Sequence, residues 1–176
     1  MTERIIIAGS GGQGIMLCGK VLAQAAMSEG KFVTWLPAYG AEVRGGTAHC
    51  MVIISDEEIG SPYINKADTL IIMNQPSLTR FKNRLENKGL LIINSSMVDV
   101  EVEIKALKFP FTDIAVELGN VKVANMIALG VYLGKKKVVS IKNILEVMKM
   151  MTPSGRADIL KVNQEALDTG VKLKNG

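Results

Sequence analysis

Short apolar runs alternate along the chain with longer segments of helical periodicity. Strands are expected where apolar or β-branched runs are bounded by turn residues, at 4–8, 31–36, 47–55, 67–74, 89–96 and near 106–111. Helices are expected where apolar residues recur every three or four positions, at 12–29, 76–87, 112–119, 121–134, 140–151 and 156–172. Gly30 is expected to end the first helix as a C-terminal cap.

Strands that are apolar on both faces and alternate with helices predict a mostly parallel sheet covered on both sides. The expected fold is α/β: a doubly wound, mostly parallel, Rossmann-like sheet with a helical C-terminal part, in a single domain over residues 1–176. Such sheets bind ligands beyond the carboxyl ends of the strands, where the strand order reverses. Three polar or glycine-rich segments follow strands and are expected to share this rim: "GSGGQG", "PAYGAEVRGG" and "NSS".

The segment Gly9–Gly14 has the spacing G-x-G-x-x-G between a strand and a helix, which is typical of a phosphate-bearing ligand. Its first glycine is expected to allow a tight turn, its second the approach of a pyrophosphate, and its third close packing of helix on strand. NAD sites also need an acid at the end of the second strand, where this chain has Thr34-Trp35-Leu36. A phosphate or pyrophosphate ligand is therefore favoured over NAD, with a purely structural turn as the other interpretation.

Composition narrows the possible functions. Hydrophobic residues make up 48% of the chain and charged residues 22%, as in folded globular proteins, and no apolar run is long enough to span a membrane. The net charge is +4 and aromatic residues are only 5%, so the basic, aromatic-interleaved stripe of nucleic-acid-binding proteins is not expected. We expect a cytoplasmic protein without a leader and without a membrane or nucleic-acid partner.

Candidate chemistry is sparse. No paired carboxylates, nucleophile–base pair or metal cluster stands out, so no catalytic residue and no metal ligand is predicted. Cys18 and Cys50 lack metal or redox spacing and are expected to be reduced and buried, and His49 to be a core or interface residue. Arg44 offers a planar guanidinium to a phosphate or carboxylate. Asn125, in an apolar helix, needs a polar partner, which is either backbone or ligand.

Several separate segments appear in an order that resembles a known family: "GSGGQGIMLCGKVLAQAA", "TWLPAYGAEVRGGTAHC", "SP" at 61–62, "MNQPSL", "NSS" and "ELGNVKVANMIALG". The chain resembles the gamma subunit of 2-oxoacid:ferredoxin oxidoreductases, above all the 2-oxoglutarate type, over about residues 3–135. Residues 136–176 are helical and basic, and we interpret them as a covering layer or a subunit interface.

The resemblance implies a complex that decarboxylates a 2-oxoacid, with 2-oxoglutarate as the expected acid, on thiamine diphosphate. Electrons would pass through [4Fe-4S] clusters to ferredoxin, and the acyl group to coenzyme A. Thiamine diphosphate, Mg²⁺ and the clusters would lie on alpha, beta and, where present, delta subunits, so this chain is not expected to be active alone.

The resemblance also implies that this chain contributes the coenzyme A site. Coenzyme A needs no ribose-diol acid, which fits the residues that follow the second strand. A free-standing NAD(P)-binding reductase and a ligand-free scaffold subunit are the alternatives. The residues expected to contact coenzyme A are Gly9, Ser10, Gly11, Gly12, Gln13, Gly14, Arg44, Ser95 (or its neighbour Ser96) and Asn125.

Replacing Arg44 by Ala is expected to raise the apparent KM for coenzyme A while decarboxylation without coenzyme A survives. A charge-assisted contact to a phosphate is worth about 1.5–3 kcal/mol, and steady-state kinetics of the complex would measure its loss. An unchanged KM would remove Arg44 from the site.

Overall fold

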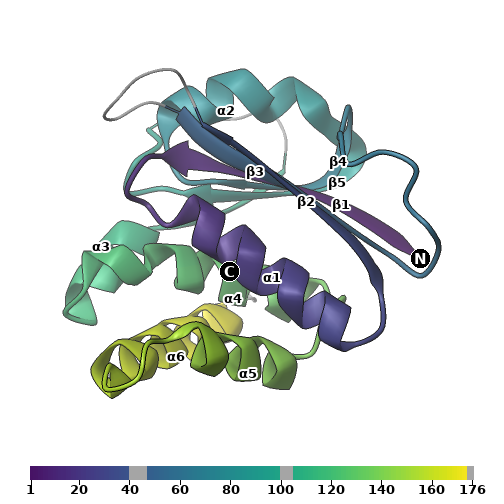
Figure 1. The fold of residues 1–176 in the computed structure, drawn as a ribbon. Helices are drawn as coiled ribbons and strands as arrows, with labels where there is room; N and C mark the ends of the chain where they lie inside the picture. Colours follow the sequence, from purple (N-terminus) through teal and green to yellow (C-terminus); the bar gives the residue numbers. More distant parts are fainter. Residues whose placement is uncertain (40–46, 100–104, 174–176) are drawn as a thin grey trace.

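The computed structural model describes residues 1–39, 47–99 and 105–173, which form one six-stranded sheet with helices on both faces (Figure 1). The strands are β1 (Thr2–Ser10), β2 (Phe32–Tyr39), β3 (Thr47–Ser55), β4 (Ala67–Ile72), β5 (Leu85–Asn94) and β6 (Ala106–Phe109). The helices are α1 (Ile15–Ser28), α2 (Gln75–Phe81), α3 (Phe111–Glu117), α4 (Ala124–Lys135), α5 (Ile141–Met151) and α6 (Ala157–Lys172), with 3₁₀ turns η1 (Lys82–Arg84) and η2 (Val121–Val123). None of the helices in these ranges is long and apolar enough to cross a lipid bilayer.

The strand order is β2-β3-β1-β4-β5-β6. Parallel pairing joins β1 to β4, β4 to β5 and β5 to β6, whereas β3 is antiparallel to both of its neighbours. The chain leaves β1 through α1 on one face of the sheet and leaves β4 through α2 on the other (Figure 1). The strand order therefore reverses at β1, and the expected doubly wound, mostly parallel α/β fold is confirmed.

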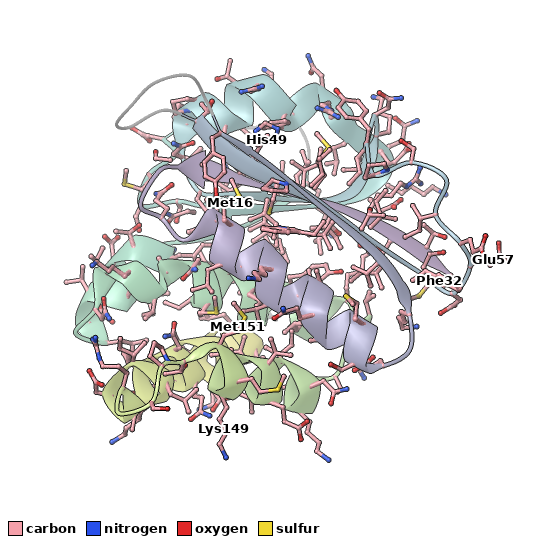
Figure 2. All side chains as sticks on the ribbon, viewed as in Figure 1. Met16, Phe32, His49, Glu57, Lys149 and Met151 are labelled. Atoms are coloured by element: carbon pink, nitrogen blue, oxygen red, sulfur yellow. The ribbon has the colours of Figure 1, made fainter. Side chains whose placement is uncertain are left out.

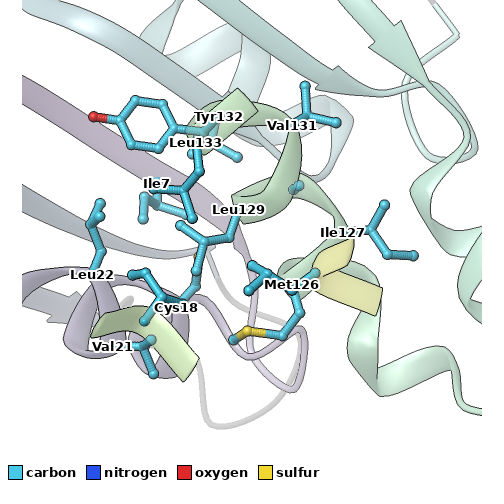
Figure 3. Packing of buried hydrophobic residues seen from close by; sticks show 14 of the residues in the cluster. Ile7, Cys18, Val21, Leu22, Met126, Ile127, Leu129, Val131, Tyr132 and Leu133 are labelled. Carbon is cyan, nitrogen blue, oxygen red and sulfur yellow. The ribbon is translucent and has the colours of Figure 1, made fainter. Parts of the chain in front are cut away.

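Alternation along β1 divides the core between the two faces. Ile5 and Ile7 belong to the core under α1, and Ile6 and Ala8 to the core under α2; all four are buried. Figure 3 shows the first of these cores, where side chains of α1 meet those of α4 around Ile7. The C-terminal helices α4, α5 and α6 complete this layer, so the helical C-terminal part covers one face of the sheet.

The ends of the helices and strands agree with those expected from the sequence in some places and differ in others. Gly30 ends α1 as expected: its φ is +76°, and the Lys31 N–H donates to the Ala26 carbonyl at 3.3 Å, as in a Schellman motif. The helix expected over 76–87 was too long, because α2 stops at Phe81 and β5 already begins at Leu85. Leu85 pairs with Ala67 across a bulge and is buried, so tertiary pairing overrides the helical period there.

Two glycines let α4 and α6 touch through their backbones. A Cβ on Gly170 would meet the carbonyl oxygen of Ile127, and one on Gly130 would meet that of Leu167. Each Cβ would therefore face main-chain atoms of the opposite helix, which cannot rotate away as a side chain can. This contact seats α6 on the helical layer.

His49 of β3 lies on the face of the sheet that α2 covers, and Met16, at the start of α1, lies on the opposite face (Figure 2). The His49 ring packs on Phe81 with 4.8 Å between ring centroids, and its Nδ1 is buried without a hydrogen-bond partner among the described residues. Burial, together with the nearby Arg80 and Arg84 guanidinium groups, lowers the pKa of His49. His49 is therefore a neutral, buried residue at pH 7, but it is not the hydrogen-bonded core histidine expected from the sequence, because its Nδ1 has no described partner.

Replacing Gly170 by Ala is expected to lower the free energy of unfolding by about 1–3 kcal/mol through overpacking, although alanine is the better helix former. Urea unfolding would measure this change. Gly60→Ala is the matched control, because a Cβ at Gly60 meets open space among the described residues. A Gly170→Ala variant as stable as the parent would contradict the contact.

Stability is expected to fall as pH drops from about 7.5 to 5.5, because the unfolded chain, where the pKa of His49 is about 6.5, binds a proton before the folded chain does. The loss levels off below the lowered pKa of His49 in the folded state. Urea unfolding at several pH values would show it, and His49→Gln should flatten the slope in this window. Glu29 and Asp56, whose pKa values are lowered from 4.5 and 3.8, act at more acidic pH. The same slope in His49→Gln would refute the assignment.

Candidate functional site

A cleft of about 290 Å³ opens beyond the carboxyl end of β1, where the strand order reverses. One wall is the loop from β1 to α1 together with the first turn of α1, and the facing wall comes from the end of β2 and the start of β3. This is the rim at which doubly wound sheets bind ligands. The lining residues are Ser10, Gly11, Gly12, Gly14, Ile15, Met16, Leu17, Tyr39 and Ala48.

Backbone conformation and packing impose different constraints on the four glycines of the loop. Gly12 and Gly14 have φ angles of +91° and +68°, so they make the turn. Gly9 lies in β1, not in the turn as the sequence suggested, and a Cβ there would lie 2.5 Å from Gln13 Oε1 and 2.9 Å from Met73 Cβ. A Cβ on Gly14 would overlap the side chain of Asn125, so the third glycine of the motif admits a side chain of α4.

Gly11 is different, because nothing in the described chain requires a glycine there. It has no positive φ, and an added Cβ would find no described atom within 4 Å. A bare backbone that borders a cleft is what close approach of an external group requires.

The electrostatics of the cleft favour an anion. Within the described residues, no acceptor takes the N–H groups of Gly11, Gly12, Ile15 and Met16. The first turn of α1 holds no acidic residue, so its positive end is not neutralised locally. None of the residues that line the cleft carries a charge. Free N–H groups at a helix N-terminus are a general means of binding phosphate.

Amide side chains hold the loop from the α2 side. The Ser10 N–H donates to Gln13 Oε1 at 2.7 Å, and Gln13 Nε2 donates to the Met73 carbonyl at 3.4 Å. Asn74 Nδ2 donates to the Ser10 hydroxyl at 2.6 Å, while Asn74 Oδ1 caps α2 by accepting the Ser77 N–H at 3.1 Å. Sequence reasoning assigned no role to Asn74, although an Asn two positions before Pro76 is a helix-start signal that could have found it.

Asn125 holds the loop from the α4 side. Its Nδ2 donates to the Gly14 carbonyl at 2.9 Å, and its Oδ1 accepts the Met126 N–H at 2.9 Å. The residue is 2% exposed. Of the two partners that the sequence left open, the structure therefore gives Asn125 the backbone.

Ser95 and Ser96, which follow β5, make different hydrogen bonds. The Ser96 hydroxyl accepts the Asp113 N–H at 3.2 Å near the start of α3. Ser95 donates its N–H to the Phe109 carbonyl at 2.9 Å, and its side chain is exposed. Asn94 Nδ2 donates to the same Met73 carbonyl as Gln13, at 3.3 Å, which links the end of β5 to the glycine loop.

His49, Cys18 and Cys50 were also singled out in the sequence, and they are not among the residues that line the cleft. Arg44 lies outside the described residues. His49 lies on the opposite face of the sheet. Burial raises the pKa of the Cys18 thiol. Burial also raises the pKa of the Cys50 thiol, to about 12, so both thiols are protonated at neutral pH. Among the described residues, no three His, Cys, Asp or Glu side chains are placed to hold a metal ion.

A second cavity, of about 190 Å³, lies between α1, α4 and the corner from α5 to α6. Its walls are mainly apolar, with Leu17, Met126, Met148 and Met151 among them. The glycine-loop cleft is the better candidate for an anionic ligand, because it borders the N-terminus of α1 and backbone N–H groups that have no described acceptor.

Comparisons with known proteins agree with this geometry. The chain matches the pyruvate ferredoxin/flavodoxin oxidoreductase family over residues 4–173. It is 37% identical over 171 residues to the ketoisovalerate oxidoreductase subunit VorA of Methanothermobacter thermautotrophicus, covering 96% of this chain but only 36% of VorA. It is 35% identical over 163 residues to the 2-oxoglutarate synthase subunit KorC of the same organism, covering 87% of this chain and 86% of KorC.

Solved structures give the same result. The gamma subunit of a keto/oxoacid ferredoxin oxidoreductase from Geobacter sulfurreducens superposes with a TM-score of 0.83 at 26% identity, covering 98% of both chains. A 2-oxoglutarate:ferredoxin oxidoreductase from Magnetococcus marinus, with 2-oxoglutarate, coenzyme A and succinyl-CoA bound, superposes with a TM-score of 0.88 at 25% identity. The match covers 99% of this chain and 31% of that one. The expected resemblance is thus confirmed: this chain belongs to the pyruvate ferredoxin/flavodoxin oxidoreductase family.

Proposed function

We propose that this chain is the gamma-type subunit of a 2-oxoacid:ferredoxin oxidoreductase and binds coenzyme A in the glycine-loop cleft. The observation that carries the proposal is Gly11, a glycine that neither backbone conformation nor packing explains and that borders the cleft. The Magnetococcus marinus relative, whose structure contains coenzyme A, has the same fold across 99% of this chain.

In this proposal the pyrophosphate of coenzyme A lies against the N–H groups of the loop and the first turn of α1. Gln13, Asn74 and Asn125 do not touch the ligand but hold the loop in shape before it arrives, so little ordering is needed on binding. The exposed Ser95 side chain and Arg44 are the further contacts proposed. The chain would thus bind and orient the acyl acceptor.

Redox and thiamine chemistry is assigned to partner subunits. An iron–sulfur cluster needs several thiolates, and Cys18 and Cys50 are buried with raised pKa values. We propose that thiamine diphosphate, Mg²⁺ and the [4Fe-4S] clusters lie on alpha, beta and, where present, delta subunits, and that ferredoxin accepts electrons from the assembled complex. Thiamine diphosphate supplies the carbanion chemistry of decarboxylation when it is bound.

Identity to KorC subunits supports 2-oxoglutarate rather than pyruvate as the acid. The chain spans only about a third of the length of the VorA relatives, whereas it spans 86% of the Methanothermobacter thermautotrophicus KorC subunit at 35% identity. Pyruvate synthase subunits PorC have a similar length but lower identity, 26% in Methanothermobacter marburgensis. The 2-oxoglutarate type is therefore favoured over the pyruvate type.

The NAD(P)-binding alternative loses support from the geometry of β2. This strand runs on to Tyr39, three residues past its expected end, and still no Asp or Glu follows within its described length. The ribose-binding acid of NAD sites has no counterpart there.

Gly11→Ala tests the proposal in the complex of this chain with its partner subunits, purified from the host. The variant should unfold at the same temperature as the parent, because the added methyl group meets open space. Its KM for coenzyme A should rise by about tenfold or more, as expected for weakened hydrogen bonds to a charged ligand. Steady-state kinetics with 2-oxoglutarate and ferredoxin would measure it.

Gly60→Ala is the control, since its Cβ also meets open space but far along the chain from the cleft. If Gly11→Ala left the KM for coenzyme A unchanged in a fully assembled complex, the glycine loop would not be its site. The scaffold alternative predicts that outcome.

A further inference from the structure

Tyr39 is an aromatic side chain that the rest of the described chain leaves unused. It is the last residue of β2 and is 74% exposed, more than Tyr63 at 55% or Phe32 at 46%. The ring of Tyr63 is covered by the Arg84 guanidinium at 5.1 Å, whereas no described ring or cation lies over Tyr39. Both faces of a large apolar ring are thus available to something outside the described residues.

The sheet register places this ring beside the glycine loop. Tyr39 pairs with Ala48 on β3, and Ala48 pairs with Gly9 on β1, so the three residues form one row across the sheet. Two strand spacings separate Tyr39 from Gly9, a distance of about 10 Å. Along β2, Val33 and Trp35 pack on the core under α1, so alternation directs Tyr39 to the same face as the cleft.

The cleft accordingly has two chemically different ends. One end offers the free N–H groups of Gly11, Gly12 and the first turn of α1. The other end offers the Tyr39 ring, with Ala48 between them as a small side chain that leaves room. Leu17, which is 42% exposed, adds an apolar surface on the α1 wall. An anionic group joined through a short spacer to a flat apolar ring system matches both ends.

We propose that Tyr39 is the stacking surface for the adenine base of coenzyme A, with the pyrophosphate on the glycine loop. This inference rests on the proposed coenzyme A site and adds to it the residue that recognises the nucleotide end. One ribose separates adenine from the pyrophosphate, which suits the row from Gly9 through Ala48 to Tyr39. An exposed aromatic ring provides a π-face on which a base stacks, and such contacts are a general means of binding bases.

The test compares ligands with and without a base in the intact complex. Tyr39→Ala should raise the KM for coenzyme A, and the inhibition constant of ADP competing with coenzyme A, each by about tenfold, since base stacking is worth roughly 1–3 kcal/mol. The inhibition constant of inorganic pyrophosphate, which has no base, should not change, and neither should kcat. Tyr39→Phe keeps the ring and should behave as the parent in every assay.

Four results would overturn the stacking role. They are an unchanged KM in Tyr39→Ala, an equal loss for pyrophosphate and ADP, a loss in Tyr39→Phe that matches Tyr39→Ala, or failure of the Tyr39→Ala chain to join its partner subunits. The last result would make Tyr39 part of a subunit interface. Gly11→Ala distinguishes failure of the proposed coenzyme A site from failure of the stacking role. If Gly11→Ala raises the KM for coenzyme A while Tyr39→Ala does not, coenzyme A binds at the glycine loop and only the stacking role of Tyr39 is refuted.

Discussion

The loop between β1 and α1 keeps its shape because three amide side chains hold its backbone from two sides. Gln13 and Asn74 secure Ser10 on the α2 side, and Asn125 secures the Gly14 carbonyl from α4. Each amide nitrogen donates one hydrogen bond and each amide oxygen accepts one within the chain, so all three side chains are held in place. The cleft, the free N–H groups and the open space at Gly11 all follow from a loop that is fixed in this way.

Charged side chains are distributed unevenly between the amino ends and the carboxyl ends of the parallel strands. Near the amino ends of β1 and β4, the buried Glu3 accepts the Thr69 hydroxyl at 2.7 Å and pairs with Lys136 at 3.2 Å, and Arg4 contacts Asp68 through two guanidinium nitrogens. These charges satisfy one another. None of the residues that line the cleft at the carboxyl end of β1 carries a charge, and backbone N–H groups of the glycine loop and of the first turn of α1 have no described acceptor. An anion bound there would meet donors without first displacing a carboxylate.

The comparisons place the chain among proteins in which this fold is sometimes a separate subunit and sometimes about a third of a longer chain. The fold is therefore found in this family both on its own and within a longer chain. Its described residues offer no metal cluster, and its two thiols are held protonated by burial. The hydrogen bonds that hold the glycine loop all come from this chain, whereas in our proposal the oxidation chemistry belongs to partner subunits.

Features that depend on neighbouring residues along the chain could be predicted from the amino-acid sequence alone. It fixed the alternation of strands and helices, the exact span of β3, the Gly30 cap and the position of the glycine loop, because periodicity and turn chemistry are local. The sequence could not show why individual positions of the loop are glycine. A side chain at Gly9 would clash with Met73, and one at Gly14 would clash with Asn125, which lies 111 positions away. The strand order, the early start of β5 at Leu85, and the row that brings Tyr39 level with Gly9 are visible only in the folded chain. Those features depend on which strands become neighbours, and the free energy of that choice comes from burial and pairing between distant segments, which no local pattern records.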